Sequence, residues 1–261
     1  MNDPAELPAT AQPSPAPVAN QSLGWPWFIL QAATVALVYV IGSTLPVLPA
    51  VVRAVLDNAG EPELTSPVVA ATAILGMAMA LGTCWLWLRS ERRVGAVFQL
   101  AAPASWSSTL AWAALTTGGV LAIFTGGGAL VQAMGLPSPD PSFVLDFVTE
   151  SPAMFVLWVV GVAWLAAGLG EELLFRGFLM DRLERLAGLR GRMWLVLLVQ
   201  ALLFGTLHGY QGLGGILVTG AVGLLLGWVR VIQRGNLWAV VLAHAAVDTI
   251  SMSLAYAGVS G

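Results

Sequence analysis

Seven stretches of about 20 mostly apolar residues recur along this chain of 261 residues, and they constrain its fold more than any other feature. A helix of about 20 apolar residues is long enough to cross the hydrocarbon core of a bilayer. Only 10% of the residues are charged and 57% are apolar, which is unlike the composition of a soluble domain. We therefore predict an all-α fold, a polytopic membrane helix bundle with about seven transmembrane helices, over residues 25–46, 67–88, 110–134, 154–180, 193–210, 213–233 and 237–257.

The amino-terminal residues 1–22 differ in composition from the rest of the chain. They are rich in Pro, Ala and polar residues and have no hydrophobic period, which predicts a disordered tail. A secretory signal peptide would begin with basic residues, whereas this segment carries Asp3 and Glu6 and leads into a full-length span. We expect a tail and no signal peptide.

Arginines gather in three connections that share one side of the membrane if the chain crosses it seven times. They follow the second, fourth and sixth spans, at positions 89, 92, 93, 182, 185, 190, 192, 230 and 234. The opposite connections carry six carboxylates and a single arginine, Arg53. Because cytoplasmic loops are enriched in Lys and Arg, we expect the arginine side and the amino terminus to be cytoplasmic.

Four ionisable residues lie in three of the last four spans, namely Glu171, His208, His244 and Asp248. A charged group near the bilayer midplane costs several kcal/mol, roughly 3 on insertion scales, so such residues mark a pathway, a partner or a reaction. A single buried histidine is as often only a hydrogen-bond partner between helices. The occurrence of all four groups in these spans favours a functional site.

Local spacing separates the roles of two adjacent glutamates. Glu172 and Arg176 are four residues apart and share one face of a helix, where they can form an ion pair, while Glu171 points elsewhere. The same spacing places His244 and Asp248 on one helix face. Glu171 is therefore the carboxylate that stays available for chemistry.

The helical rise places the four ionisable groups at compatible depths, about 10 to 22 Å from the arginine-side ends of their helices, so they can converge on one cavity. Hydrolysis of a peptide bond there needs a base for the water and donors for the developing oxyanion. Glu171 with one histidine can supply the base. His244 with Asp248 can supply the donors.

Three motifs occur in order on separate predicted spans: Glu171-Glu-x-x-x-Arg176, Phe204-x-x-x-His208 and His244-x-x-x-Asp248. This series resembles that of the CPBP family, which includes the CAAX prenyl proteases and bacteriocin-immunity related membrane proteins. The resemblance extends from about residue 160 to the carboxyl terminus. It implies variable leading transmembrane helices at residues 23–150 and a catalytic core of four transmembrane helices at residues 151–261, which follow the disordered cytoplasmic tail predicted at residues 1–22.

The resemblance further implies a CAAX-protease-like intramembrane glutamic endopeptidase. In such an enzyme Glu171, aided by His208, activates the water, while His244 and the residue at Asp248 polarise the scissile carbonyl. The family has Asn or Asp at the position of Asp248, and the eukaryotic-type CAAX enzymes usually have Asn. An Asp donates a hydrogen bond to an oxyanion only when it is protonated, so orientation of His244 is an equal alternative for Asp248.

The expected surroundings of this site follow from the same resemblance. Glu172 and Arg176 take a supporting role, no cofactor is expected, and a mechanism without metal is favoured. Two histidines and a carboxylate could still hold a divalent ion, so a metalloprotease stays an alternative, although the chain has no His-Glu-x-x-His motif. We expect an integral, multi-pass protein of a bacterial cell membrane whose partners are membrane lipids and a membrane-associated or lipidated peptide, with prenylated peptides among the candidates, and no nucleic acid.

Two other functions remain open. A non-catalytic immunity or scaffold protein of the same fold would tolerate Glu171→Gln, whereas the same change would abolish proteolysis. A transporter could use the carboxylates as proton relays, but it would usually show two related halves, and the first three spans contain no repeat of the motifs. The sequence leaves the substrate and the oligomeric state open.

Overall fold

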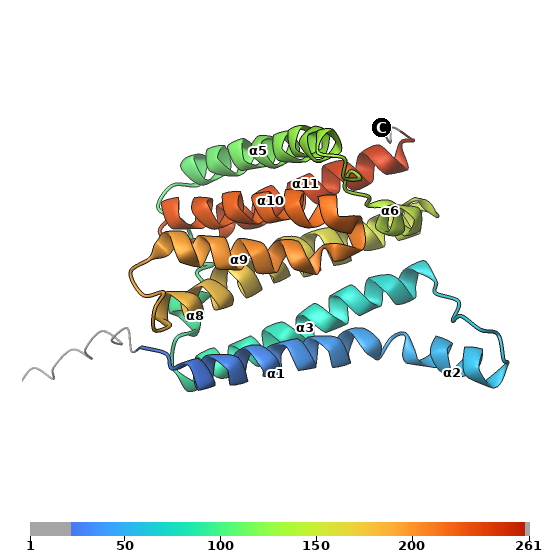
Figure 1. Ribbon diagram of the computed structural model, residues 1–261, viewed down its shortest axis with the longest axis horizontal. Helices are drawn as coiled ribbons and strands as arrows, with labels where there is room; N and C mark the ends of the chain where they lie inside the picture. The colour runs from blue at the N-terminus through green and yellow to red at the C-terminus, as the bar shows by residue number, and fades with distance from the viewer. Residues whose placement is uncertain (1–21, 259–261) are drawn as a thin grey trace, which may run out of the picture.

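The computed structural model describes residues 22–258 as an elongated bundle of helices whose axes are roughly parallel or antiparallel to one another (Figure 1). The predicted tail at residues 1–22 lies, apart from its last residue, outside the described residues. The elements are α1 (Trp25–Thr44), α2 (Leu48–Leu56), α3 (Ser66–Ser90), α4 (Val94–Val97), α5 (Trp106–Ala133), α6 (Ser142–Thr149), α7 (Pro152–Leu157), the π-helix η1 (Trp158–Leu179), α8 (Met180–Arg185), α9 (Met193–Leu207), the 3₁₀ turn η2 (Gly209–Gln211), α10 (Gly212–Ile232) and α11 (Trp238–Tyr256).

Six helical segments of the described chain are long and apolar enough to cross a membrane. They are α1, α3, α5, the continuous rod of α7, η1 and α8, then η2 with α10, and α11. Each coincides with a predicted span, which confirms the all-α, polytopic bundle. The predicted fifth span is the shorter helix α9, whose 15 residues extend about 22 Å, less than the roughly 30 Å of a hydrocarbon core.

α9 ends earlier than predicted because the chain reverses inside the bundle. The helix stops at Leu207 and the chain turns through η2 into α10. The two helices pack so closely that a Cβ added at Gly205 would lie 2.4 Å from the carbonyl oxygen of Ile216. Figure 1 shows that this hairpin ends well short of the neighbouring ends of α3 and α11.

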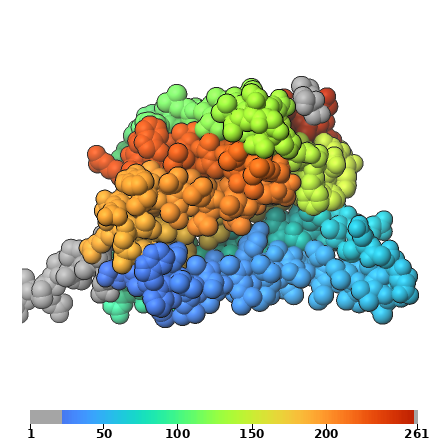
Figure 2. Space-filling view, viewed as in Figure 1, coloured from blue at the N-terminus to red at the C-terminus, as the bar shows by residue number. Residues whose placement is uncertain are grey.

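Helices from the first half of the chain pack directly on those that carry the motifs. α1 and α3 form an antiparallel pair, and α3 packs along η1. On the other side, α11 packs against both η1 and α5, and α5 also contacts α10. In the space-filling view, α9 and α10 form the front of the bundle above α1 (Figure 2).

Two short helices lie in connections that the sequence analysis treated as loops. α2 continues beyond α1 and exposes Val55 and Leu56, while α6 packs on α7 and α11. The α6 end of the bundle is held by a short chain of hydrogen bonds. The indole of Trp158 donates to Ser66 Oγ at 2.9 Å, and that hydroxyl donates to the carbonyl of Phe147 at 3.0 Å.

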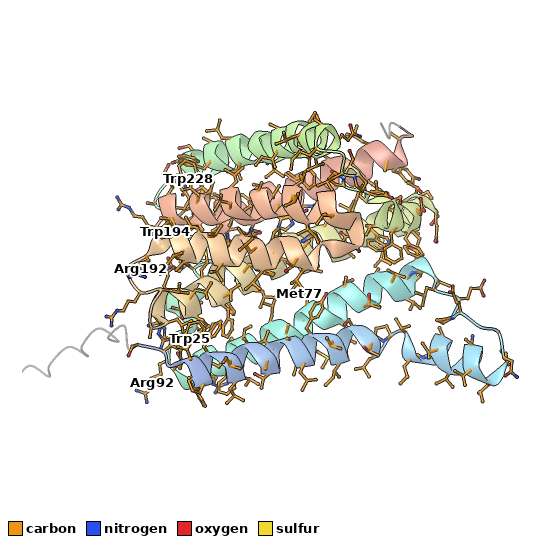
Figure 3. The ribbon with its side chains drawn as sticks, viewed as in Figure 1. Trp25, Met77, Arg92, Arg192, Trp194 and Trp228 are labelled. Carbon is orange, nitrogen blue, oxygen red and sulfur yellow. The ribbon has the colours of Figure 1, made fainter. Side chains whose placement is uncertain are left out.

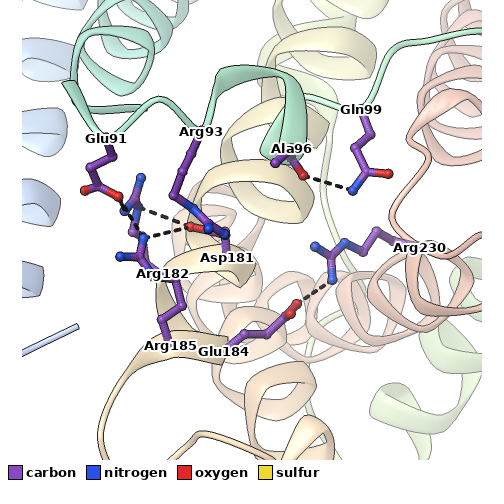
Figure 4. Close-up of polar contacts among 9 residues, drawn as sticks. All are labelled: Glu91, Arg93, Ala96, Gln99, Asp181, Arg182, Glu184, Arg185 and Arg230. Carbon is purple, nitrogen blue, oxygen red and sulfur yellow. Dashed lines mark hydrogen bonds and ion pairs between the residues drawn. The ribbon is translucent and has the colours of Figure 1, made fainter. Parts of the chain in front are cut away.

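The arginines at the ends of α3, α8 and α10 and in the connections after them lie at one end of the bundle, called here the arginine end. A carboxylate at this end joins three helices (Figure 4). Glu91, directly after α3, accepts hydrogen bonds from Arg182 at 2.6 Å, Arg185 at 2.8 Å and Gln31 at 3.0 Å. Burial by itself raises the pKa of Glu91, but the hydrogen bonds from Arg182 and Arg185 outweigh burial and lower that pKa. Glu91 thus ties α1 and α3 to α8.

Two further ion pairs complete this end. Arg93 pairs with Asp181, and Arg230 pairs with Glu184, so the segment after α3 and the end of α10 are both fastened to α8. Figure 4 shows the side chains of both pairs, Arg93 with Asp181 and Arg230 with Glu184.

Replacement of Glu91 by Gln is expected to lower the melting temperature of the purified protein by a few degrees. The change weakens hydrogen bonds to two guanidinium groups, and each charged hydrogen bond contributes about 1.5–3 kcal/mol. Because the folded pKa of Glu91 lies below its ordinary value of 4.5, the stabilisation is present above that pH and is lost as the pH falls through the folded pKa. Thermal unfolding in detergent at neutral and acidic pH measures this.

The matched control is Glu63→Gln, because Glu63 is exposed and forms no ion pair within the described chain. It should leave the melting temperature unchanged at both pH values. Equal effects of the two variants would contradict the role assigned to Glu91.

Candidate active site

A cavity of about 940 Å³ lies inside the bundle, and the four ionisable residues predicted to form a site all line it. Glu171 comes from η1, His208 follows α9, and His244 and Asp248 come from α11. Parts of α1, α3, α5 and α10 complete the walls. The structure thus brings the four residues together, while their chemical roles remain predictions.

The two adjacent glutamates have different surroundings. Glu172 is fully buried, and its Oε1 accepts hydrogen bonds from Arg176 Nη1 at 2.9 Å and from His244 Nδ1 at 2.8 Å. Glu171 faces the cavity, and its buried Oε2 has no hydrogen-bond partner within the described chain. The pair that spacing predicted between Glu172 and Arg176 is present, whereas the bond to His244 was not predicted.

The helix that carries both glutamates is wound differently from the predicted α-helix. Residues Trp158–Leu179 form a π-helix, and at its end the N–H of Met180 lies close to the carbonyl of Phe175, five residues earlier. Such wider turns are rare and occur frequently at functional sites. The acidic pair lies well inside this segment, so its orientation depends on π-helical geometry.

Glu172 determines which ring nitrogen of His244 carries a proton. An ionised carboxylate only accepts hydrogen bonds, so Nδ1 of His244 donates in the 2.8 Å contact. Nε2 of His244 lies 3.8 Å from Oδ2 of Asp248, which is too far for a hydrogen bond. Nε2 of His244 and the carboxyl group of Asp248 are therefore available to a bound substrate.

His208 is held by the backbone of its own helix. Its Nδ1 lies 2.8 Å from the carbonyl oxygen of Phe204, and since a carbonyl only accepts, Nδ1 carries the hydrogen. In the neutral ring Nε2 is then free to accept a proton. The ring of Tyr210 lies next to it, with ring centres 6.0 Å apart.

The ring of Phe204 packs on Arg176 of the buried ion pair and lies next to both histidines. The Arg176 guanidinium lies 4.2 Å from the centre of the Phe204 ring. The same ring centre is 4.8 Å from that of His208 and 6.1 Å from that of His244. The sequence analysis used Phe204 only to define a motif, but its ring contacts both histidines and covers the arginine.

Gln200 is a residue of this site that the sequence analysis did not select. Its Nε2 donates to the carbonyl oxygen of Gly223 at 2.7 Å, and Arg176 Nη2 donates to the same oxygen at 3.3 Å. The carbonyl oxygen of Gly223 in α10 therefore binds both Arg176 of η1 and Gln200 of α9. A polar residue in the middle of an apolar helix was the only signal in the sequence.

Close packing of η1 against α11 brings Glu172 within reach of His244. A Cβ added at Gly168 would lie 2.7 Å from the Cβ of Ala245 and 3.1 Å from its Cα. Ala245 directly follows His244. A larger residue at position 168 would therefore separate the two helices next to the hydrogen bond between Glu172 and His244.

The cavity extends from the ionisable residues toward the end of the bundle opposite the arginines. Its lining there comes from the connection after α5, from α6 and η2, and from the second half of α11. Tyr210 and Phe143 line it and are about half exposed, at 54% and 52%. Gln211 Oε1 and Thr219 Oγ1 add buried polar atoms without partners in the described chain.

Metal binding would need the two histidines and a carboxylate to converge. Among the described residues, no three His, Cys, Asp or Glu side chains are grouped so that they could hold a metal ion. Nδ1 of each histidine already contacts a protein acceptor.

This fold and this cavity define a polytopic helical membrane protein with ionisable groups inside its bundle. Residues 152–250, from α7 into α11, match the family model of the Rce1-like type II CAAX prenyl endopeptidases. The match covers less than half of the chain and confirms the resemblance to the CPBP/CAAX protease family that was inferred from the motifs. Comparisons with curated proteins and with solved structures found no match. The family supports a CAAX-type intramembrane protease function.

Replacement of Gly168 by Ala is expected to lower the melting temperature by a few degrees. The added methyl group would overlap Ala245, and overpacking of this kind costs roughly 1–3 kcal/mol. Thermal unfolding of the purified variant measures the effect. The second change Ala245→Gly removes the nearest overlapping atom and should recover part of the loss.

Gly82→Ala is the matched control, since a Cβ added at Gly82 in α3 meets nothing within 4 Å. Ala is the better helix former, so this control should be neutral or slightly stabilising. If both glycine variants behaved alike, the close packing of η1 on α11 would not matter for stability.

Proposed function

We propose that this protein is an intramembrane endopeptidase that hydrolyses peptide bonds with a water activated by Glu171 and His208. The observation that carries the proposal is the buried carboxylate oxygen of Glu171, which lines the cavity without a hydrogen-bond partner in the described chain. A carboxylate in this position can accept a proton from water. Glu172 is unsuited to this role because it does not line the cavity and its Oε1 is held by Arg176 and His244.

In the proposed hydrolysis, the groups in the cavity accept the proton from water and later return it to the leaving group. Glu171, assisted by the free Nε2 of His208, takes a proton from water while the water oxygen attacks the scissile carbonyl carbon. The tetrahedral intermediate collapses as the C–N bond breaks, and the proton held by the protein passes to the leaving nitrogen. The products are a carboxylic acid and an amine, and no cofactor enters these steps.

His244 and Asp248 act on the carbonyl oxygen in this proposal. With Nδ1 fixed by Glu172, a protonated Nε2 of His244 can donate a hydrogen bond to the developing oxyanion. Asp248 either orients that ring or, when protonated, donates a second hydrogen bond. Glu172 positions His244, and Arg176 neutralises the charge of Glu172.

The substrate is proposed to be a membrane-associated peptide, with lipidated and prenylated peptides as candidates. Apolar side chains from α3, α5, α6 and α10 make up much of the cavity wall. An extended peptide segment next to a lipid or a transmembrane stretch can bury apolar surface there while its backbone reaches the polar groups. Surrounding membrane lipids are the other expected partners.

We propose that the arginine end faces the cytoplasm of a bacterial cell, with the amino terminus on the same side. The arginines follow α3, α8 and α10, and the opposite connections are acidic. Because the cavity extends toward the opposite end, the cleaved segment would then enter from the outer side of the membrane.

Glu171→Gln is expected to reduce peptide cleavage by at least about a hundredfold, because loss of a general base typically costs two to four orders of magnitude. The assay compares purified proteins in nanodiscs on prenylated, unprenylated and transmembrane peptides, with product formation followed by mass spectrometry. Glu150→Gln is the matched control because Glu150 is exposed and outside the cavity, and it should keep full activity.

Cleavage by wild type and control but not by Glu171→Gln would support the protease proposal. Equal cleavage of unmodified soluble peptides would remove the preference for lipidated substrates. If folded wild-type protein cleaved none of the peptides, the non-catalytic immunity or scaffold function would become the better hypothesis.

The proposed orientation predicts the labelling of two introduced cysteines by a membrane-impermeant maleimide. Ser142→Cys, at the exposed start of α6, should react in intact cells, whereas Ala187→Cys, exposed after α8, should react only after permeabilisation. The wild type is the control because its single cysteine, Cys84, is fully buried. The reverse pattern would show that the arginine end faces outward.

A further inference from the structure

A second cavity, of about 610 Å³, opens at the arginine end of the bundle. Its walls come from α4 and α8, from the connection between α8 and α9, and from the connection between α10 and α11. It is separate from the cavity with the ionisable residues and shares no lining residue with it. The proposed catalytic chemistry does not use it.

The charge of this second cavity is strongly positive. Two carboxylates, Asp181 and Glu184, line it together with six arginines, which are Arg93, Arg185, Arg190, Arg192, Arg230 and Arg234. Ion pairs engage both carboxylates. The positive charge of the arginines is therefore only partly balanced within the cavity.

Three of these arginines have no carboxylate partner within the described chain. Arg190 and Arg234 are exposed and form no ion pair there, and Arg192 bonds only the carbonyl oxygen of Gly188, at 3.4 Å. They approach the cavity from two different connections, one before α9 and one after α10. A single anion between them could bind guanidinium groups from both connections.

The arginines that do form ion pairs also have unused donors. The Nε atoms of Arg93 and Arg230 are buried and have no hydrogen-bond acceptor in the described chain. Each unsatisfied buried donor is unfavourable. A ligand with several anionic oxygens can offer acceptors to such donors, and guanidinium groups bind phosphate oxygens particularly well.

An apolar surface leads from this cavity along the outside of α9. Trp194 directly follows Met193, which lines the cavity, and is 65% exposed. Leu198 and Leu202 follow Trp194 at four-residue intervals along α9, and both are exposed. Figure 3 shows Arg192 and Trp194 at the same end of the bundle. Tryptophan is enriched at the level of lipid headgroups. Cationic groups and an exposed apolar strip are thus adjacent.

We propose that this second cavity binds the phosphate-bearing headgroup of an anionic phospholipid, whose acyl chains lie along α9. Basic pockets between transmembrane helices at the cytoplasmic side are suited to such headgroups. The bound phosphate bridges the connection before α9 and the connection after α10, so it holds together two segments that end next to α8. This inference does not depend on the proposed protease activity.

Titration of the detergent-purified protein with phosphatidylglycerol, followed by native mass spectrometry, tests the proposal. The double variant Arg190→Gln/Arg234→Gln should weaken binding of this lipid by about tenfold or more, because each basic residue near an anionic headgroup contributes on the order of 1 kcal/mol. The matched control is Arg89→Gln/Arg92→Gln, which removes the same charge from exposed positions at the same end but outside the cavity. The control should bind like wild type.

Four results would overturn the proposal. Equal weakening by both double variants would show general charge attraction in place of a site. Equal binding of phosphatidylcholine would show that the anionic headgroup is not recognised. Competition by free glycerol phosphate at the same concentration as the lipid would show a site for phosphate alone. Unchanged binding by Arg190→Gln/Arg234→Gln would place the lipid elsewhere.

The same titration separates this inference from the protease proposal. Glu171→Gln protein should bind phosphatidylglycerol like wild type, since Glu171 does not line the second cavity. Loss of lipid binding in the arginine variant would support the lipid site whether or not any peptide is cleaved.

Discussion

The fully buried ion pair between Glu172 and Arg176 is the interaction on which the candidate active site depends. Each charge offsets the cost of burying the other, and removal of either partner would leave an uncompensated charge inside the bundle. The pair also extends outward, because Glu172 accepts a hydrogen bond from His244 and Arg176 donates one to Gly223. It therefore joins η1 to α11 and α10, and Glu171 is left without a hydrogen-bond partner for its buried Oε2 in the described chain.

The sequence predicted those features that depend on local spacing and on composition. The apolar stretches located the spans, and the four-residue separation of Glu172 and Arg176 predicted their ion pair, which is present at 2.9 Å. Gathering of Glu171, His208, His244 and Asp248 around one cavity was also expected, because helical rise places them at similar depths. Helical periodicity and span length are sufficient to predict such features, because each depends on the geometry of a single helix or on the thickness of a bilayer.

Contacts between distant segments could not be predicted in this way. His244 and Glu172 are 72 positions apart, and their hydrogen bond requires Gly168 to let α11 approach η1. The π-helical winding of η1 likewise leaves no periodic mark that distinguishes it from an α-helix. α2 and α6 were missed because each is too short to span a membrane, and α9 ended early because its hairpin partner α10 determines where the chain reverses.

The two ends of the bundle differ in the contacts that hold their helices together. At the arginine end, the Glu91 network and the pairs around Asp181 and Glu184 cross-link α1, α3, α8 and α10, so relative movement of these helices would break several charged contacts. At the other end the α9–α10 hairpin stops short, and the cavity reaches exposed side chains such as Tyr210. A substrate that entered through the ionic end would have to separate those pairs, whereas entry at the open end disturbs none of them. The distribution of charge thus cross-links the helices at one end and leaves the other end as the entry route for the peptide substrate proposed above.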